Sequence, residues 1–354
     1  MCRPSVLLIL GLCPGVIGAT ITGWGWDLYP VPSWPRAKDY IAISAGRHHS
    51  LALTRQGEIA GWGEDSFGQA SPPPGGGFVA ISAGGWHSLA LHRDGSIVGW
   101  GYNEDEQATP PAGNDFVAIA AGGWHSMALR ADGTVVCWGI KQGQNYFGQT
   151  QQVAGNDFVA IAAGGWHSLA LRSDGTVTAW GRNDFGQGTP DPFPAWNDFV
   201  AVAAGGQHNL AIHADGSVAA WGNNGYGQCG IPPGRDYVGI AAGLYHSLAL
   251  TEDGVVVAWG ADGYGQGSPP ANTDCLAIAA GWHHNLALIP SAYGADLNGD
   301  GQVDMADVSI VAEHWKETSC DYPGWCEGAD VDHDGDVDLA DVLLVSEYWL
   351  WQRP

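Results

Sequence analysis

Short apolar segments separated by regularly spaced turn residues dominate residues 21–289. The unit 158–187 shows the pattern: its apolar runs predict three strands, at 158–163, 167–171 and 176–180. The pair Asp174-Gly175 between the second and third strands suits the positive φ angles of a type I′ hairpin turn. Strands this short, with turn signals this regular, indicate antiparallel β-structure.

The unit repeats along the chain. The phrase Ala-Gly-x-x-His occurs seven times, ending at His49, His87, His125, His167, His208, His246 and His284. The phrase Trp-Gly also occurs seven times, beginning at Trp24, Trp62, Trp100, Trp138, Trp180, Trp221 and Trp259. The spacing of 38 to 42 residues suits the blades of a β-propeller. An open solenoid is the alternative, and it predicts atypical capping repeats at both ends.

The two ends of the repeat region are complementary halves of one unit. The first unit has the Trp-Gly strand 21–25 but no Ala-Gly-x-x-His before it, and the last has 279–288 but no Trp-Gly after it. A ring explains this split, because pairing the two halves completes a blade and removes exposed sheet edges. We therefore predict a closed, all-β seven-bladed propeller over residues 20–290, in which 20–27 pairs with 275–289.

These motifs resemble the RCC1-type repeat (regulator of chromosome condensation). One repeat carries all of them, in Ala242 to Leu250, Asp253-Gly254, Trp259-Gly260 and Tyr264-Gly265-Gln266. The resemblance covers about three quarters of the chain and implies seven four-stranded blades. No insertion resembles the wedge that nuclear members use for nucleotide exchange on a small GTPase. The compact repeats are more similar to secreted bacterial members, among them an inhibitor that binds β-lactamases.

Residues 292–354 differ from the repeats in charge, with 15 acidic and 2 basic residues. Two phrases 34 residues apart have EF-hand loop spacing, with oxygen ligands at positions 1, 3, 5, 9 and 12, a backbone carbonyl at 7 and Gly at 6. All-oxygen ligand sets in acidic loops favour calcium, so we expect two ions. The predicted ligands are Asp296, Asn298, Asp300, Gln302, Asp304 and Asp307 in the first loop, and Asp330, Asp332, Asp334, Asp336, Asp338 and Asp341 in the second.

An apolar stripe at helical spacing follows each loop, which predicts a small all-α domain over 291–354. The stripe residues are Met305, Val308, Val311 and Trp315, then Leu339, Val342, Val345 and Trp349. A duplicated loop and helix with Asp at loop position 12 resembles a dockerin domain. The resemblance implies folding on calcium and attachment to a cohesin-like partner, often in polysaccharide-degrading systems. Met305-Ala306 and Leu339-Ala340 replace a hydroxyl pair that is common in cellulosomal dockerins, which leaves the cohesin specificity open.

The N-terminus predicts secretion. Arg3, the apolar run 6–12 and the small pair Gly18-Ala19 are typical of a signal peptide over residues 1–19. No later stretch is apolar enough to span a bilayer. Export permits disulfides, and Cys320 and Cys326 are the expected pair because they are close in sequence. The remaining thiols, Cys137, Cys229 and Cys275, are interpreted as small buried hydrophobes.

The charge excludes some partners and the repeat suggests others. With 13 basic against 37 acidic residues, the net charge of −24 argues against nucleic acid and anionic lipid. A His at the same position of every blade indicates a structural role that all blades share. We therefore expect its imidazole to form a hydrogen bond to backbone rather than to bind a metal. The recurring Trp is expected in the core.

The residue before each recurring His varies while its neighbours do not. This predicts an interaction surface at one end of the ring, formed by His48, Trp86, Trp124, Trp166, Gln207, Tyr245 and His283. The alternative is that these side chains pack against neighbouring blades.

Three functional classes remain open from the sequence. The chain has no Gly-x-Ser-x-Gly elbow, phosphate-binding loop or zinc-type His/Cys spacing. The leading hypothesis is therefore a secreted, non-catalytic binding protein with a monomeric propeller that recognises a protein or a glycan. Its calcium module would attach it to a scaffold. A secreted O-glycosyl hydrolase of a polysaccharide-degrading system and a purely structural protein are the alternatives.

Overall fold

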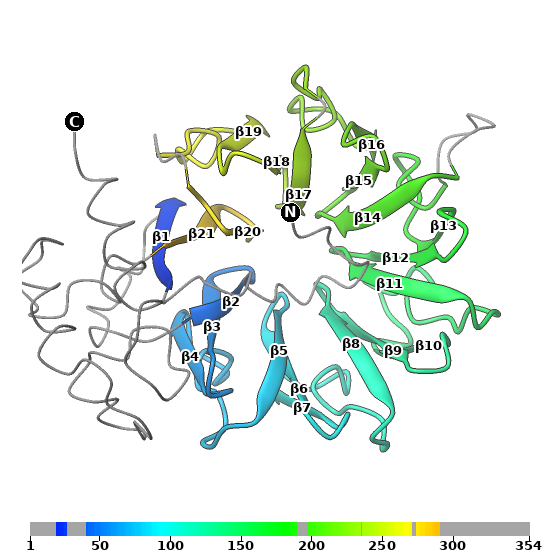
Figure 1. Ribbon diagram of the computed structural model, residues 1–354. Helices are drawn as coiled ribbons and strands as arrows, with labels where there is room; N and C mark the ends of the chain where they lie inside the picture. The colour runs from blue at the N-terminus through cyan, green and yellow to red at the C-terminus, as the bar shows by residue number, and fades with distance from the viewer. Residues whose placement is uncertain (1–18, 27–39, 190–196, 235, 271–273, 291–354) are drawn as a thin grey trace, which may run out of the picture. The chain divides into compact units, whose positions relative to one another are not determined.

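The structure, a computed structural model, describes residues 19–26, 40–189, 197–234, 236–270 and 274–290. These residues form seven antiparallel sheets that surround a common axis (Figure 1). The predicted closed propeller is confirmed, and the open solenoid is excluded. Residues 1–18 of the predicted signal peptide, the calcium-loop domain with its twelve candidate ligands, and the pair Cys320 and Cys326 lie outside the described residues.

Six blades follow one another along the chain, each with three strands in sequence order. Their bounds are β2 (Tyr40–Ala45), β3 (His49–Thr54) and β4 (Ile59–Gly63); β5 (Phe78–Ala83), β6 (His87–His92) and β7 (Ile97–Gly101); β8 (Phe116–Ala121), β9 (His125–Arg130) and β10 (Val135–Gly139); β11 (Phe158–Ala163), β12 (His167–Arg172) and β13 (Val177–Gly181); β14 (Phe199–Ala204), β15 (His208–His213) and β16 (Val218–Gly222); β17 (Tyr237–Ala242), β18 (His246–Thr251) and β19 (Val256–Gly260). The seventh blade contains β1 (Ala19–Gly25), β20 (Ala277–Ala280) and β21 (His284–Pro290).

The core lies between the blades. The first strands of successive blades contact one another around the axis, and in six blades the middle strand packs on the first strand of the next blade. Leu169 and Leu171 of β12, for example, pack on Phe199 and Trp221 of the following blade. The Trp of the Trp-Gly phrase is buried in five blades and partly buried in the other two, which confirms its predicted place in the core.

The hairpin turn differs in type from the prediction. Only Gly175 of the Asp174-Gly175 pair has a positive φ, at +81°, whereas a type I′ turn needs two such residues. The N–H of Arg172 bonds the carbonyl of Thr176, which encloses a three-residue loop with Gly175 in the left-handed region. Asp174 Oδ1 accepts from the N–H and the hydroxyl of Thr176, at 2.9 and 2.7 Å. The aspartate therefore stabilises the loop with its side chain rather than through an unusual backbone conformation.

Each sheet of the described chain has three strands, not the four that the family resemblance implies. The Tyr/Phe-Gly-Gln segment takes the place of the fourth strand. In the first blade Asp65 Oδ1 accepts from the N–H of Ala70 at 2.7 Å, so the backbone folds around this side chain instead of pairing with β4. The Gln69 carbonyl accepts from Ser88 Oγ and Trp100 Nε1, both at 2.9 Å. The segment therefore connects its own blade to the next one.

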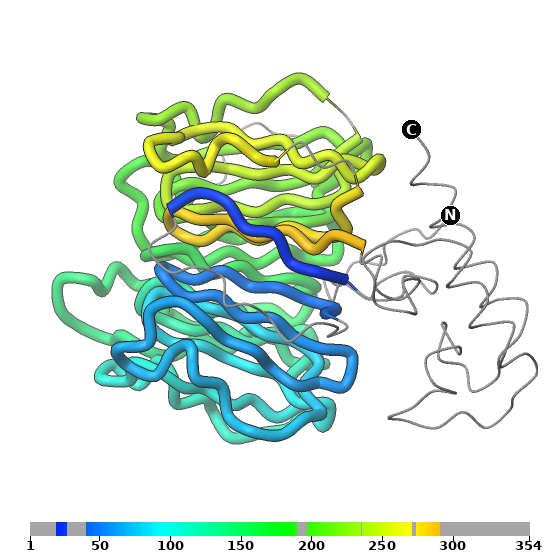
Figure 2. The backbone as a smooth tube through the Cα atoms, turned by 90° about the vertical axis from the view of Figure 1, so that its left-hand side faces the viewer, coloured from blue at the N-terminus to red at the C-terminus, as the bar shows by residue number. Residues whose placement is uncertain are grey.

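The seventh blade closes the ring with both ends of the propeller. Its strand order is β1-β21-β20, which pairs the first strand of the chain with its last (Figure 2). Trp24 Nε1 donates to the Gln266 carbonyl at 3.2 Å, and the N–H of Trp26 donates to the His283 carbonyl at 2.8 Å. The split repeat unit is therefore completed in space.

A closed belt of side-chain hydrogen bonds joins all seven blades. Each recurring His contacts, through Nε2, the Ser or Asn that follows the recurring His of the next blade. The seven pairs are His49–Ser88, His87–Ser126, His125–Ser168, His167–Asn209, His208–Ser247, His246–Asn285 and His284–Ser50, at 2.6 to 2.9 Å. The expected backbone acceptor was wrong: a small polar side chain fits here because it is itself anchored to the Gln carbonyl of the preceding blade.

The belt determines the tautomer of its histidines. Ser88 Oγ donates its proton to the Gln69 carbonyl, so it must accept the Nε2–H of His49. The same holds for Asn209, whose amide donates to the Gln187 carbonyl while Oδ1 faces His167. Nδ1 is then a bare acceptor, and in six of the seven histidines this atom is buried without a hydrogen-bond partner. Protonation would place a charge and an unpaired donor in the core.

A second belt of backbone hydrogen bonds surrounds the axis. At six of the seven joints, the N–H of the residue after Ala-Gly donates to the Gly carbonyl of the next blade at 3.0 to 3.2 Å. A Cβ on Gly84 would lie 2.7 Å from both the Gly122 carbonyl oxygen and His87 Cε1. The glycine of Ala-Gly-x-x-His is therefore required by close approach of two blades and of the imidazole.

The histidine belt predicts a steep loss of stability in mild acid. Burial lowers the pKa of His87, His125 and His208 to about 3 and of His167 and His284 to about 4. The pKa is about 6.5 in the unfolded chain. Below pH 6.5 the unfolded chain therefore binds more protons, and the free energy of unfolding falls as the pH falls towards 4. Each histidine contributes about 1.4 kcal/mol per pH unit.

Thermal melts between pH 7 and 5, where most carboxylates stay ionised, measure this slope. We expect His87→Asn to reduce the slope by about one proton, because it removes one imidazole that stays neutral in the fold. A melting temperature independent of pH in this window would contradict the neutral belt.

Ring closure by β1 predicts that the whole propeller loses stability when residues 20–27 are deleted. The deletion exposes the edge of β21 and removes the Trp24–Gln266 bond. We expect a lower melting temperature and faster amide hydrogen exchange as far away as β12, measured by mass spectrometry. Exchange that rises only in β20 and β21 would show instead that one end frays while the ring persists.

Candidate binding face

All seven variable residues lie at one end of the propeller. The second residue after each recurring Trp donates its N–H to the carbonyl of one of them, as Tyr102 does to Trp86 at 2.9 Å. The bond recurs in every blade, so these residues share one end with the loops that follow the third strands. We call this end the aromatic face; its ring residues are His48, Trp86, Trp124, Trp166, Gln207, Tyr245 and His283.

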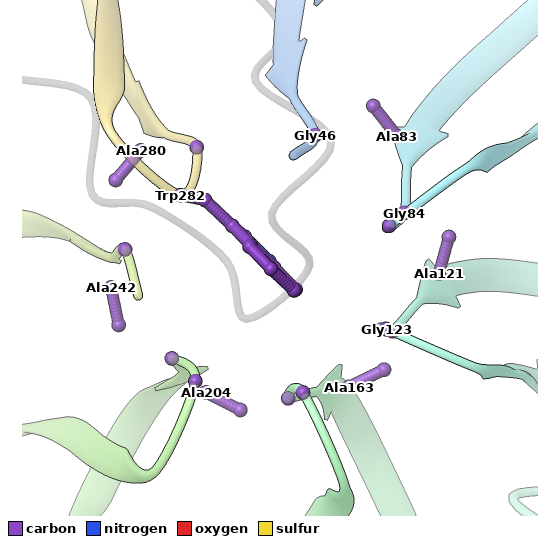
Figure 3. Close-up of a pocket in the computed structure, with 18 of the residues that line it drawn as sticks. Gly46, Ala83, Gly84, Ala121, Gly123, Ala163, Ala204, Ala242, Ala280 and Trp282 are labelled. Atoms are coloured by element: carbon purple, nitrogen blue, oxygen red, sulfur yellow. The ribbon is translucent and has the colours of Figure 1, made fainter. Parts of the chain in front are cut away.

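The centre of the aromatic face is asymmetric. The residues that precede the ring residues are Arg47, Gly85, Gly123, Gly165, Gly206, Leu244 and Trp282, so three large side chains stand opposite four glycines. Trp282 extends across the central opening, which the Ala-Gly segments of all blades line (Figure 3). The glycines are also required locally, since a Cβ on Gly123 would lie 2.5 Å from the Gly165 carbonyl oxygen.

Arg47 packs against two indoles, which form a corner beside this opening. Its Cζ lies 4.2 Å from the ring centroid of Trp86 and 4.4 Å from that of Trp282, which is the geometry of a double cation–π contact. Its Nε donates to His48 Nε2 at 3.1 Å. The bond requires a neutral His48, and burial, with Arg47 and His283 adding to it, lowers the pKa of His48 to about 4.

The ring tryptophans Trp86, Trp124 and Trp166 are partly exposed and pack on other aromatic side chains of the face. Trp86 and Trp124 lie with ring centroids 4.5 Å apart, and Trp282 is 5.8 Å from Trp86 and 6.4 Å from Trp166. All three ring tryptophans are partly exposed. They pack on one another across the face of the ring instead of inserting between blades, and they leave part of each indole open to solvent.

A second aromatic group lies where β1 meets the last blade. Trp26 stacks on Tyr264 with centroids 5.3 Å apart and contacts His48 and His283 edge to face at 4.9 and 5.6 Å. The sequence analysis did not select Trp26, because it follows the Trp-Gly phrase at a position that varies between repeats.

The loops that follow the third strands add an outer set of aromatic residues, which the sequence analysis did not select as candidates for binding. Phe67, Phe147, Phe185, Tyr226 and Tyr264 are between 38% and 61% exposed, which is unusual for side chains of this size. Tyr226 packs on the ring residue Tyr245 and Phe67 on Tyr102, both at 5.0 Å. The recurrence of Tyr/Phe-Gly-Gln was the available signal for this outer set.

One loop replaces the aromatic residue with acids. The sequence Asp105-Glu106-Gln107 occupies the position of Tyr/Phe-Gly-Gln in the other blades. Glu106 replaces the glycine and adopts the same left-handed backbone conformation, with φ +63°. Glu106 pairs with Lys141 at 3.0 Å, and the Tyr102 hydroxyl donates to Glu104 at 2.8 Å. This loop gives the aromatic face an acidic edge.

The described part of the chain offers little evidence for a metal site, a membrane-spanning helix or a reactive cysteine. No group of three His, Cys, Asp or Glu there could hold a metal ion, and no helix there could cross a membrane. Cys137 and Cys275 are buried free thiols and Cys229 is partly buried, so the buried-hydrophobe prediction is confirmed for the first two. Burial raises the pKa of Cys137 to about 12 and that of Cys229 to about 11, which makes both thiols poor nucleophiles.

The chain belongs to the family of RCC1 (regulator of chromosome condensation) repeat proteins. The family model matches residues 40–69, 78–107, 116–149, 158–187, 199–228 and 237–266, just over half of the chain. The blade shared between the two ends of the propeller is not among these matches. A second model, the dockerin type I domain, matches residues 294–350. Among curated proteins, none matches the chain.

Solved structures with the same fold are distant in sequence. Prp20p of Saccharomyces cerevisiae is 19% identical with a TM-score of 0.64, covering 78% of this chain and 92% of its own. Human WBSCR16 is 18% identical with a TM-score of 0.63, covering 77% and 99%. The CR4 receptor kinase ectodomain of Physcomitrella patens is 23% identical with a TM-score of 0.57, covering 68% of each chain. At these identities the likeness shows the fold alone.

Proposed function

We propose that this protein is a non-catalytic binding protein in which the aromatic face of the propeller recognises a protein partner and the dockerin module attaches the chain to a cohesin-like scaffold. The observation that carries the proposal is the continuous aromatic face. Trp, Tyr and Arg are the residues most enriched at interface hot spots, and here they gather at the centre of one surface. Charged residues lie around them, as in the polar rim of protein interfaces.

The distribution of acids supports binding over hydrolysis. A glycosidase needs two carboxylates that face one scissile bond. In the described part of the aromatic face the acids are spread over four loops, as Glu64 and Asp65, Glu104 to Glu106, Asp184, and Asp262, whereas the centre holds indoles and a guanidinium. This arrangement favours a recognition surface and gives the O-glycosyl hydrolase alternative no support.

The structure of Prp20p was described together with its binding to Gsp1p and histones, and a second structure shows Kap60 bound to the same yeast protein. These binding partners are known for Prp20p and not for the present protein. For this chain they support only the idea that the fold serves protein recognition. A glycan is the alternative ligand class. We expect the protein to be secreted, because a signal peptide is predicted and dockerins are associated with extracellular assemblies.

The dockerin match supports calcium as the ligand of the acidic module. Four carboxylates would come together in the first loop, from Asp296, Asp300, Asp304 and Asp307, and five in the second, from Asp330, Asp332, Asp334, Asp338 and Asp341. Such clusters repel one another without a cation, so calcium binding and folding of the module are coupled. Two ions, one per loop, are the expected stoichiometry.

The proposal predicts opposite effects of two Trp→Ala substitutions in one blade. Trp180 is buried, at 9% exposure, so Trp180→Ala should cost about 3–5 kcal/mol of stability. Trp166 is partly exposed on the aromatic face, so Trp166→Ala should lower the melting temperature far less. Binding to a partner captured from the secreted fraction should instead weaken at least tenfold with Trp166→Ala, and likewise with Trp86→Ala and Trp124→Ala. Retained binding in all three variants would place the recognition surface elsewhere.

The proposal also predicts that chelation of calcium unfolds residues 294–351 and leaves the propeller intact. Calorimetric titration of the chelated full chain should show calcium binding together with a gain in helical circular dichroism. Asp300→Asn with Asp334→Asn should abolish both signals, whereas Asp94→Asn in the propeller should change neither. Calcium binding without a structural change would remove the argument that the module is a calcium-dependent tether.

A further inference from the structure

Four arginines of the described chain stack on aromatic rings, and three of them also pair with a carboxylate. Arg130 lies over Phe116 and pairs with Asp115 at 2.6 Å. Arg172 lies over Phe158 and pairs with Asp157, and Arg182 lies near Phe147 and Trp166 and pairs with Asp184. Arg47 contacts the ring faces of Trp86 and Trp282, but among the described residues no carboxylate is within ion-pair distance of it.

The surroundings of Arg47 leave its charge only partly compensated. Burial lowers the pKa of its guanidinium, although the nearby charge of Glu64 acts in the opposite direction. The ring centroids of Trp86 and Trp282 are 5.8 Å apart, so the two indoles form a corner against the guanidinium instead of covering both of its faces, and Nε is used by His48. The two terminal nitrogens at its edge remain, and this edge is the part of arginine that binds a carboxylate through two parallel hydrogen bonds.

The charges farther out restrict what can approach this centre. Acidic side chains on the surrounding loops are Glu64, Asp65, Glu104, Asp105, Glu106, Asp184 and Asp262. A ligand with many carboxylates, such as a polyuronate, would meet this rim and be repelled, since the centre offers one cation. A protein segment with one carboxylate among neutral or basic residues fits both the centre and the rim.

We propose that the protein partner of the aromatic face inserts one carboxylate, flanked by apolar side chains, onto Arg47 beside Trp86 and Trp282. This inference rests on the proposed function and specifies its partner. The apolar flanks would cover the partly exposed indoles of Trp124 and Trp166, and the excluded water would strengthen the ion pair. The carboxylate comes from an Asp or Glu side chain or from a chain terminus, and both present the same chemistry to the guanidinium.

The test uses a phage library of random dodecapeptides selected on the immobilised, calcium-loaded full chain. We expect selected peptides to share one Asp or Glu between apolar residues. Affinities of the synthetic peptides are then measured by fluorescence anisotropy. Replacing the acid by its amide should weaken binding at least tenfold, Arg47→Gln in the protein should weaken it as much, and the two changes together should cause no further loss. A Gln peptide with a free C-terminal carboxylate, compared with a Glu peptide whose end is amidated, identifies the source of the carboxylate.

Arg93→Gln is the matched control, because it removes one exposed arginine next to an Asp-Gly turn, away from the aromatic face. Melting temperatures of both variants establish that they fold. Peptides that bind the Arg47→Gln variant as well as wild type but lose affinity for Trp86→Ala would overturn this inference and leave the proposed function standing. A selection that yields no peptide dependent on either residue counts against both.

Two further results would overturn the inference by naming another occupant of the face. One is tighter binding of hexagalacturonate than of the selected peptides, which would make the ligand a glycan. The other is a dimer of the full chain in analytical ultracentrifugation that Arg47→Gln dissociates, which would make the occupant a second copy.

Discussion

The hydrogen bond from each recurring histidine to the next blade is the interaction on which the rest of the structure depends. Apolar side chains such as Leu169, Phe199 and Trp221 fill the space between successive blades, and their contacts are not directional. A directional bond such as His87 to Ser126 fixes how one blade sits on the next. Since the seventh bond, from His284 to Ser50, returns to the first blade, no blade can shift without breaking two bonds of the belt.

This frame separates the residues that hold the ring from those that are free to vary. The glycine and histidine of Ala-Gly-x-x-His are constrained by backbone contact and by the belt, whereas the two residues between them project at the aromatic face. Those two positions hold Arg47 and His48 in one blade and Gly85 and Trp86 in the next. A repeated scaffold therefore presents a surface without repetition, which is what specific recognition of a single partner requires.

The sequence predicted the ring, its closure and the end that carries the variable residues, because periodic phrases record interactions that every blade makes. It did not predict what only the three-dimensional arrangement shows. The Ser and Asn acceptors stand next to the histidines in sequence but bond those of a neighbouring blade, about 40 residues away. Trp282 and Arg47 occupy one repeat position at opposite ends of the propeller sequence, and they meet only because the ring closes. The missing fourth strand depends on side chains such as Asp65 that capture a backbone N–H.

The uniform tautomer of the belt has an electrical consequence. In six blades the acceptor donates its own proton to a Gln carbonyl, so the Nε2–H groups of six histidines point in the same sense around the ring. Bond dipoles arranged head to tail in a circle largely cancel, so the belt produces little net field. Neutral imidazoles add no net charge either. The charged side chains around the central opening, Arg47 among them, therefore set its electrostatic character, and they can change without disturbing the frame.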